Sequence, residues 1–222
     1  MEYIYHHLGL GDHIICNGLV REIIKKNFFE SYKLIVKKYN LPSVKFMFRD
    51  IENLLLEEVC NDQEADELIF KSNKPFKKIG FQGAYGNVAW DESFYRQCGI
   101  DFNKRWSSFK YVRNLIMEDN LYKTLNPTRE KYVLIHNKGS DGIDRIDYNN
   151  VNNSIKKIFV EKCTDTIFDY TKLIENAEEV HCVSSSFIAL VDSLDIKNEI
   201  FFHNKNVRAD SNFSLKLKWK II

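Results

Sequence analysis

The chain has 222 residues, of which 44% are hydrophobic and 28% are charged, and its formal net charge is +1. This composition is typical of a globular protein with a sizeable core, and the small net charge excludes an overall field that would attract nucleic acid or anionic membranes. The sequence has no apolar run near the ~20 residues that span a bilayer. Its first residues lack the basic and apolar regions of a signal peptide, so we expect a cytoplasmic protein with no transmembrane segment.

The cysteines support the same location. The sequence has five, an odd number, and they are far apart with no CxxC pair. This pattern indicates buried thiols in a reducing compartment rather than a disulfide framework or a zinc site.

The first part of the chain alternates between strand and helix patterns. "YIYHHL" (3–8) predicts a strand, and apolar residues at helical spacing predict a helix that starts at Asp12. A second helix is expected at 50–60, with Asp50 as its N-cap. Four more strands are expected, at 32–39, 44–48, 66–70 and 77–81.

The middle segment, 90–125, is aromatic, charged and helical in pattern, and we interpret it as a connection whose helices cover the site. Beyond it the alternation resumes and ends in a tail, 212–222, that has the pattern of an edge strand. The expected elements are strands at 132–137, 156–161, 179–183 and 198–203, and helices at 169–180 and 184–194. The sequence therefore predicts an α/β protein with parallel sheets, in two halves (1–88 and 130–222) joined by a helical connection (89–129).

Ligands of open α/β sheets bind at the carboxyl ends of the strands, and the loop "GLGDH" has this position. Gly9 and Gly11 allow positive φ or a close approach to a ligand, and Asp12 in the first helical turn is favoured as an anion, which suits a general base. The alternative is a turn followed by a capped helix. Neither the dinucleotide fingerprint nor a P-loop lysine is present.

Two later loops could bind phosphate. Ser184, Ser185 and Ser186 open a helix and offer hydroxyl and N–H groups, although one serine would suffice as a cap. In "HNKGSDGIDR", the residues His136, Lys138 and Arg145 could offer positive charge, unless this is only a solvated surface loop.

Other patterns are weaker. "GAYGN", with Gly83 and Tyr85, is a glycine turn that could touch a substrate, as could His13. The spacing of His6, His7, His13 and Asp12 fits no standard metal site, and we expect no metal. "KRWSSFKYVR" mixes basic and aromatic residues, but with acidic neighbours it is interpreted as a covering helix rather than a nucleic-acid surface.

Two stretches, "HLGLGDHIICNGLVREI" and "TIFDYTKLIENAEEVHCVSSSFIALVDSL", resemble in this order the GT-B glycosyltransferases, and in particular the heptosyltransferase-like family 9 group. The resemblance implies two Rossmann-like halves that face each other across a cleft. It implies that Asp12 is the base toward the acceptor and that Ser184, Ser185 and Ser186 hold the donor diphosphate. The chain departs from the group in its short length and in the His6–His7 pair that replaces a basic residue.

The resemblance implies a glycosyltransferase that moves a sugar from a nucleotide-diphosphate donor to a glycan or lipid-linked acceptor, without a metal or other cofactor. Gly9, Gly11, His13, Gly83 and Tyr85 would then contact substrate. The alternatives are a catalytically inactive nucleotide- or glycan-binding protein or subunit, and another α/β sugar-nucleotide enzyme. Nucleic acid is not an expected partner, whereas peripheral membrane association and the oligomeric state stay open.

Overall fold

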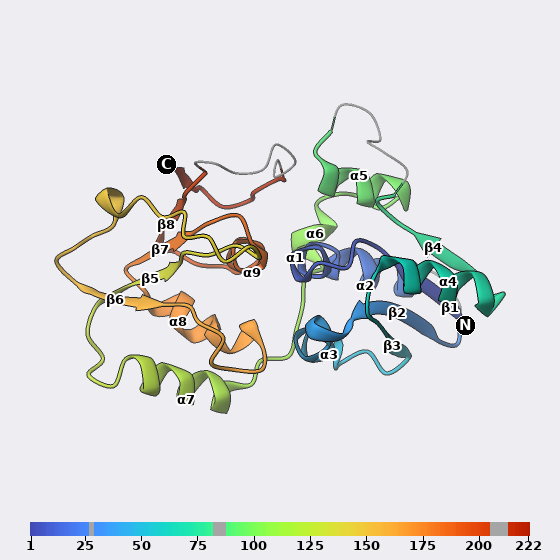
Figure 1. Ribbon diagram of the computed structural model, residues 1–222, viewed down its shortest axis with the longest axis horizontal. Helices are drawn as coiled ribbons and strands as arrows, with labels where there is room; N and C mark the ends of the chain where they lie inside the picture. Colours follow the sequence, from blue (N-terminus) through green and yellow to red (C-terminus); the bar gives the residue numbers. More distant parts are fainter. Residues whose placement is uncertain (27–28, 82–87, 205–212) are drawn as a thin grey trace. The chain divides into compact units, whose positions relative to one another are not determined.

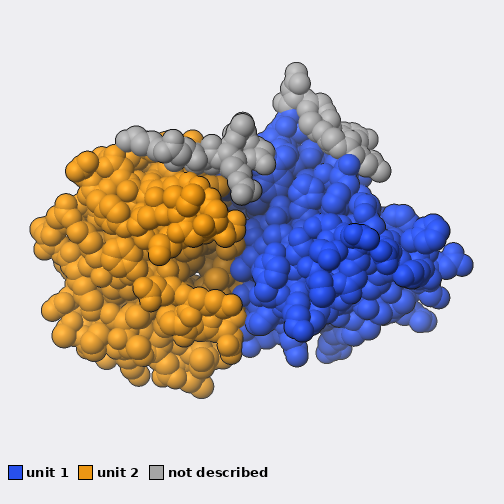
Figure 2. All heavy atoms as spheres, viewed as in Figure 1, with its two compact units in different colours: residues 1–112, 212–214 blue, residues 113–211, 215–222 orange. Residues whose placement is uncertain are grey.

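The chain divides into two units, each built on its own parallel sheet. The computed structural model describes residues 1–26, 29–81, 88–204 and 213–222. Unit 1 comprises Met1–Val112 and Asn212–Ser214, and unit 2 comprises Arg113–Ser211 and Leu215–Ile222 (Figure 2). Among the described residues, no helix has both the length and the apolar character needed to cross a membrane.

The sheet of unit 1 has the strand order β3-β2-β1-β4, and its strands are parallel (Figure 1). The strands are β1 (Glu2–Tyr5), β2 (Tyr32–Lys37), β3 (Leu54–Val59) and β4 (Phe76–Lys78). The helices are α1 (Leu10–Ile15), α2 (Asn17–Lys26), α3 (Leu41–Phe48), α4 (Asp62–Ser72), α5 (Trp90–Gln97) and α6 (Lys104–Ser107), with a 3-10 turn at Lys38–Asn40. All four residues of β1 are buried, as expected for the inner strand of a parallel sheet that carries helices.

Three of the expected elements in this unit are wrong. The segment expected as a strand at 44–48 belongs to helix α3, which begins with Pro42 in its first turn, a position that proline favours. The helix expected at 50–60 is replaced by strand β3, which pairs in register with β2. The strand expected at 66–70 belongs to α4.

Helix α4 starts at a cap that its sequence encodes. The side chain of Asn61 accepts a hydrogen bond from the backbone N–H of Glu64 at 2.9 Å, and the Glu64 carboxylate accepts one from the N–H of Cys60 at 2.6 Å. This reciprocal capping closes the first turn and specifies a helix where the apolar pattern alone suggested a strand.

The sheet of unit 2 has the strand order β6-β5-β7-β8-β9, and it is also parallel. The strands are β5 (Tyr132–His136), β6 (Lys156–Phe159), β7 (Glu179–Cys182), β8 (Glu199–Phe202) and β9 (Lys220–Ile221). The helices are α7 (Leu115–Leu125), α8 (Thr171–Asn176) and α9 (Ser186–Asp192), with 3-10 turns at Tyr148–Asn150 and Ile167–Tyr170. The α/β class and the parallel sheets predicted from the sequence are confirmed, and the tail supplies β9 at the edge of the sheet.

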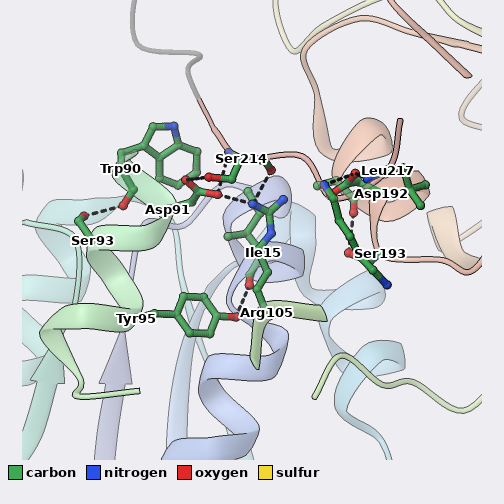
Figure 3. A network of polar contacts seen from close by, with 12 residues as sticks. Ile15, Trp90, Asp91, Ser93, Tyr95, Arg105, Asp192, Ser193, Ser214 and Leu217 are labelled. Carbon is green, nitrogen blue, oxygen red and sulfur yellow. Dashed lines mark hydrogen bonds and ion pairs between the residues drawn. The ribbon is translucent and has the colours of Figure 1, made fainter. Parts of the chain in front are cut away.

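The segment 89–129, expected as a connection, is divided between the units, since α5 and α6 belong to unit 1 and α7 belongs to unit 2. In unit 1, Arg105 and Asp91 form a fully buried ion pair. Ser214 joins this pair, since its N–H donates to Asp91 at 3.0 Å and its carbonyl accepts from Arg105 at 2.7 Å (Figure 3).

In unit 2, a second buried carboxylate holds the tail. Asp192 accepts hydrogen bonds from the backbone N–H groups of Lys216 and Leu217 and from the indole of Trp219, at 2.9–3.0 Å. Figure 3 shows Asp192 beside Leu217. These bonds bring the chain to the position from which β9 pairs with β8.

All five cysteines are free thiols. Cys16 and Cys182 are buried, whereas Cys60 and Cys163 are exposed and Cys98 is half-buried. The expectation that all of these thiols are buried is therefore wrong for the exposed pair, which lies outside both cores.

Candidate functional site

Asp12 lies in the first turn of α1, just beyond the end of β1. Its carboxylate folds back over Gly9, so closely that a Cβ on Gly9 would lie 2.4 Å from Oδ2. Because Gly9 has a φ of −70°, the glycine is needed for this close approach and not for a left-handed turn.

The environment of the Asp12 carboxyl group raises its pKa. Burial raises the pKa of this carboxyl group, and the charge of His7 and the N–H groups of Asp12 and Gly9 offset part of this rise. The Asp12 side chain keeps 22% of its surface exposed, and Nδ1 of His7 lies 3.8 Å from its Oδ1. An accessible carboxylate with a raised pKa can accept a proton from a bound hydroxyl group.

The other residues expected around this loop have different positions. His13 is fully buried, its ring packs edge-on against His6 at 4.5 Å, and burial lowers its pKa well below the usual value. The expectation that His13 contacts substrate is therefore wrong for this structure, because the ring faces the core. Gly11 lies inside α1, and Gly83 and Tyr85 lie outside the described residues.

In unit 2, the strand β5 and the serine loop meet at His136. Nδ1 of His136 lies 3.2 Å from Oγ of Ser185, and the imidazole stacks on the ring of Phe187 at 5.0 Å. Ser185 is the N-cap of α9 and accepts the N–H of Phe187. Burial lowers the pKa of His136 to about 4, so its ring is neutral at pH 7 and does not supply the positive charge expected from the sequence.

The loop that follows β5 brings the Arg145 guanidinium close to Ser184. A Cβ on Gly139 would lie 3.5 Å from both the Ser184 carbonyl and the Arg145 guanidinium, so the two loops are in contact. Arg145 forms a bidentate ion pair with Asp141, with N–O distances of 2.8 and 2.5 Å. Lys138 is exposed and forms no hydrogen bond or ion pair through its ammonium group with the residues that the structure describes.

A buried histidine pair anchors the far end of this loop. The N–H of Asp147 donates to Nδ1 of His203 at 3.0 Å, so the neutral ring carries its proton on Nε2. That nitrogen lies 2.9 Å from Nδ1 of His181, whose Nε2 lies 3.1 Å from the Glu179 carboxylate. His203 therefore donates to Nδ1 of His181, and His181 donates to the Glu179 carboxylate. This chain of hydrogen bonds fixes the loop against β7 and β8.

The structure therefore joins the two loops predicted to bind phosphate, and it places Asp12 separately in unit 1. The position of His7 beside Asp12 is not evident from the sequence, because the partners of His7 are Asp12 in α1 and Gly80, which lies far along the chain. Within the described part of the chain, no group of three or more His, Cys, Asp or Glu residues is placed to hold a metal ion.

Comparisons with known proteins identify the fold. No family model and no curated protein matches the sequence. Among solved structures, the chain is similar to a glycosyl transferase family 9 protein from Veillonella parvula, with a TM-score of 0.64 and 8% identity over 100% of this chain and 86% of that one. It is also similar to the iron-containing dodecameric glycosyltransferase TibC from enterotoxigenic E. coli, with a TM-score of 0.53 and 10% identity over 96% of this chain and 60% of that one.

At such low identity these similarities identify the fold alone. The resemblance inferred from "HLGLGDH" and the serine loop is confirmed at this level, because the described chain follows the same architecture along its whole length. The chain has the α/β fold, with two Rossmann-like sheets, of the family 9 glycosyltransferase structures.

Proposed function

We propose that this protein is a metal-independent glycosyltransferase that moves a sugar from a nucleoside-diphosphate donor to a hydroxyl group of a glycan or lipid-linked acceptor. The observation that carries the proposal is Asp12, an accessible carboxylate with a raised pKa at the carboxyl end of β1. The fold that holds it is shared with proteins described as glycosyltransferases.

Asp12 would act as the general base. Its carboxylate takes the proton of the acceptor hydroxyl as that oxygen forms a bond to the anomeric carbon. The bond from the anomeric carbon to the diphosphate oxygen breaks, and its electron pair leaves with the nucleoside diphosphate.

Unit 2 would bind the nucleotide diphosphate. Ser184, Ser185 and Ser186 offer hydroxyl and N–H donors, and Lys138 offers an exposed ammonium group in the loop that contacts Ser184. Arg145 can contribute only part of its charge, because Asp141 already holds its guanidinium. Fixed donors of this kind typically contribute a few kcal/mol to a transition state that develops negative charge, about 3 kcal/mol for one donor.

We also propose a cytoplasmic location. The support for it is that all five cysteines are free, which fits a reducing compartment.

Nucleotide binding can be tested by thermal shift with UDP, GDP, ADP and CMP. We expect one nucleoside diphosphate to stabilise the protein, and Ser185→Ala to weaken this binding several-fold. Ser193→Ala is the matched control, because this serine lies at the other end of α9 and donates only to the Ala189 carbonyl. Failure of every nucleotide to shift the melting temperature would refute a donor site in unit 2.

The base is tested by Asp12→Asn, which keeps the size of the side chain but does not accept a proton. We expect loss of sugar transfer, at least 100-fold in kcat, with nucleotide binding unchanged. Glu67→Gln is the control, because this exposed carboxylate lies on α4 and pairs only with neighbours one turn away. Full activity of Asp12→Asn would refute the assignment.

A second candidate is a nucleotide- or glycan-binding protein without catalysis. The observation that favours it is the position of the Asp12 carboxylate over Gly9 at the start of α1, because a carboxylate with a purely capping role would lie in the same place. Stabilisation by a nucleotide with no transfer to acceptor or water would identify this second function.

A further inference from the structure

His7 lies within ion-pair distance of Asp12, and its ring is held in one orientation. Its Nε2 lies 3.1 Å from the carbonyl oxygen of Gly80, and its Nδ1 lies 3.8 Å from Oδ1 of Asp12. The rings of Phe81 and Phe94 pack edge-on against it at 4.9 and 5.0 Å. These contacts on three sides leave the imidazole edge with Nδ1 directed at the carboxylate.

Gly80 makes this arrangement possible. Its φ of +90° lies in a region that residues with side chains rarely adopt, and a Cβ here would lie 2.4 Å from the Phe94 ring and 3.2 Å from Nε2 of His7. The Gly80 N–H donates to the side chain of Gln97 at 2.9 Å, which orients the peptide. A glycine is therefore required for the carbonyl to reach His7.

The hydrogen bond to the Gly80 carbonyl determines which nitrogen of His7 binds a further proton. A carbonyl oxygen only accepts hydrogen bonds, so Nε2 carries the ring proton in the neutral form and Nδ1 has the free lone pair. Any further proton binds at Nδ1, which is the atom that faces Asp12. The positive charge of the imidazolium form therefore lies beside the Asp12 carboxylate. In the neutral form of His7, the lone pair on Nδ1 is an acceptor for a proton carried by Asp12.

We propose that His7, held by Gly80, is a positioning residue that keeps Asp12 in its anionic form, ready to accept the proton of the acceptor hydroxyl. The inference rests on the proposed function, since it concerns the base of that reaction. Burial works against ionisation of Asp12, and the charge of His7 acts in the opposite direction.

The other charged or titratable groups around the pair contribute less. His6 is buried, hydrogen-bonds through Nδ1 to the His7 carbonyl, and has a pKa lowered to about 4 by burial. Lys37 on β2 also lowers the pKa of Asp12, but its ammonium is paired with Asp62 at 2.8 Å. The Cys16 thiol is buried and its pKa is raised, so it is neutral at the pH values of interest.

The direct test measures the titration midpoint of the Asp12 carboxyl carbon by ¹³C NMR, which does not depend on any activity. With the dielectric constant of water, loss of one unit charge 3.8 Å from Asp12 corresponds to a shift of about one pH unit. We expect His7→Gln to raise the midpoint by this amount and His7→Arg, which restores the charge, to leave it at or below that of the wild type.

Lys33→Gln is the matched control, because this lysine lies on β2 and pairs with Glu57 away from Asp12. Gly80→Ala gives a second perturbation that displaces the ring without changing it, and it should raise the midpoint as His7→Gln does. An unchanged midpoint in both His7→Gln and Gly80→Ala would overturn the proposal, as would an equal rise in His7→Arg, which would indicate packing rather than charge.

The pH profile of kcat gives a second measurement. If transfer is detected, the acid limb should move to higher pH by about one unit in His7→Gln, with KM nearly unchanged. If the wild type transfers no sugar to any acceptor, the proposed function fails, whereas the NMR midpoint still decides whether His7 controls the ionisation of Asp12.

Discussion

The neutral state of His136 leads to a quantitative prediction about acid stability. Burial lowers its pKa to about 4, whereas an unfolded chain has a histidine pKa of about 6.5. The unfolded state therefore binds more protons than the folded state between these values, and the free energy of unfolding falls as the pH drops through this range. One pKa unit corresponds to about 1.4 kcal/mol, so a change from pH 7 to pH 5 should cost about 2 kcal/mol from this residue alone.

Two measurements check this value. The ring of His136 should titrate near pH 4 when its ¹³C and ¹H shifts are followed by NMR. The free energy of unfolding in urea should fall by about 2 kcal/mol less between pH 7 and pH 5 in His136→Phe than in the wild type. Phenylalanine is the suitable replacement because it keeps an aromatic ring stacked on Phe187 and has no titrating group.

A ring midpoint near 6.5 would refute the reasoning, because burial would then not control the proton affinity of His136. An equal pH dependence in His136→Phe would refute the stability argument separately. With a midpoint near 6.5, His136 would be partly protonated at neutral pH and would contribute positive charge to diphosphate binding, as expected from the sequence.

Two further predictions concern the packing that supports each unit. In unit 1, a Cβ on Gly18 would lie 2.1 Å from the Lys104 carbonyl oxygen, so Gly18→Ala should destabilise the protein by about 1–3 kcal/mol in urea unfolding, despite alanine's higher helix propensity. An unchanged or higher stability would show that α6 can shift away from α2. In unit 2, Asp192→Asn places an amide against three N–H donors and should cost about 1–3 kcal/mol. Hydrogen exchange at Lys216 and Leu217 should accelerate with it, and retained protection would contradict the role given to this carboxylate.

The sequence predicted the sheets better than the short elements between them. The buried strands of unit 2, such as 132–137 and 179–183, stand out because apolar runs bounded by polar loops are typical of parallel sheets. The segments 44–48, 50–60 and 66–70 are assigned the wrong type because their apolar residues fit either periodicity. The capping signals at Pro42 and Asn61 specify helices α3 and α4, and these signals depend on single residues rather than on a pattern.

The positions of Asp12 and Ser185 could be predicted because each lies at the start of a helix that comes after a strand. The structure places them at the starts of α1 and α9, which come after the buried strands β1 and β7. His7 and His136 depend on partners that the sequence does not reveal, namely a backbone carbonyl 73 positions away and the burial of a ring against α9. Proton affinities of this kind follow from tertiary packing, which residue spacing does not encode.

The bonds that Ser214 makes with Asp91 and Arg105 have a consequence for the order of events during synthesis. Strands β1 to β4 leave the ribosome early, and the sheet of unit 1 has all of its hydrogen-bonding partners by then. Its buried ion pair gains the contacts of Ser214 only after nearly all of unit 2 has been translated. The stretch that follows Ser214 supplies β9 to the sheet of unit 2. A premature stop shortly before Ser214 would therefore leave both units incomplete.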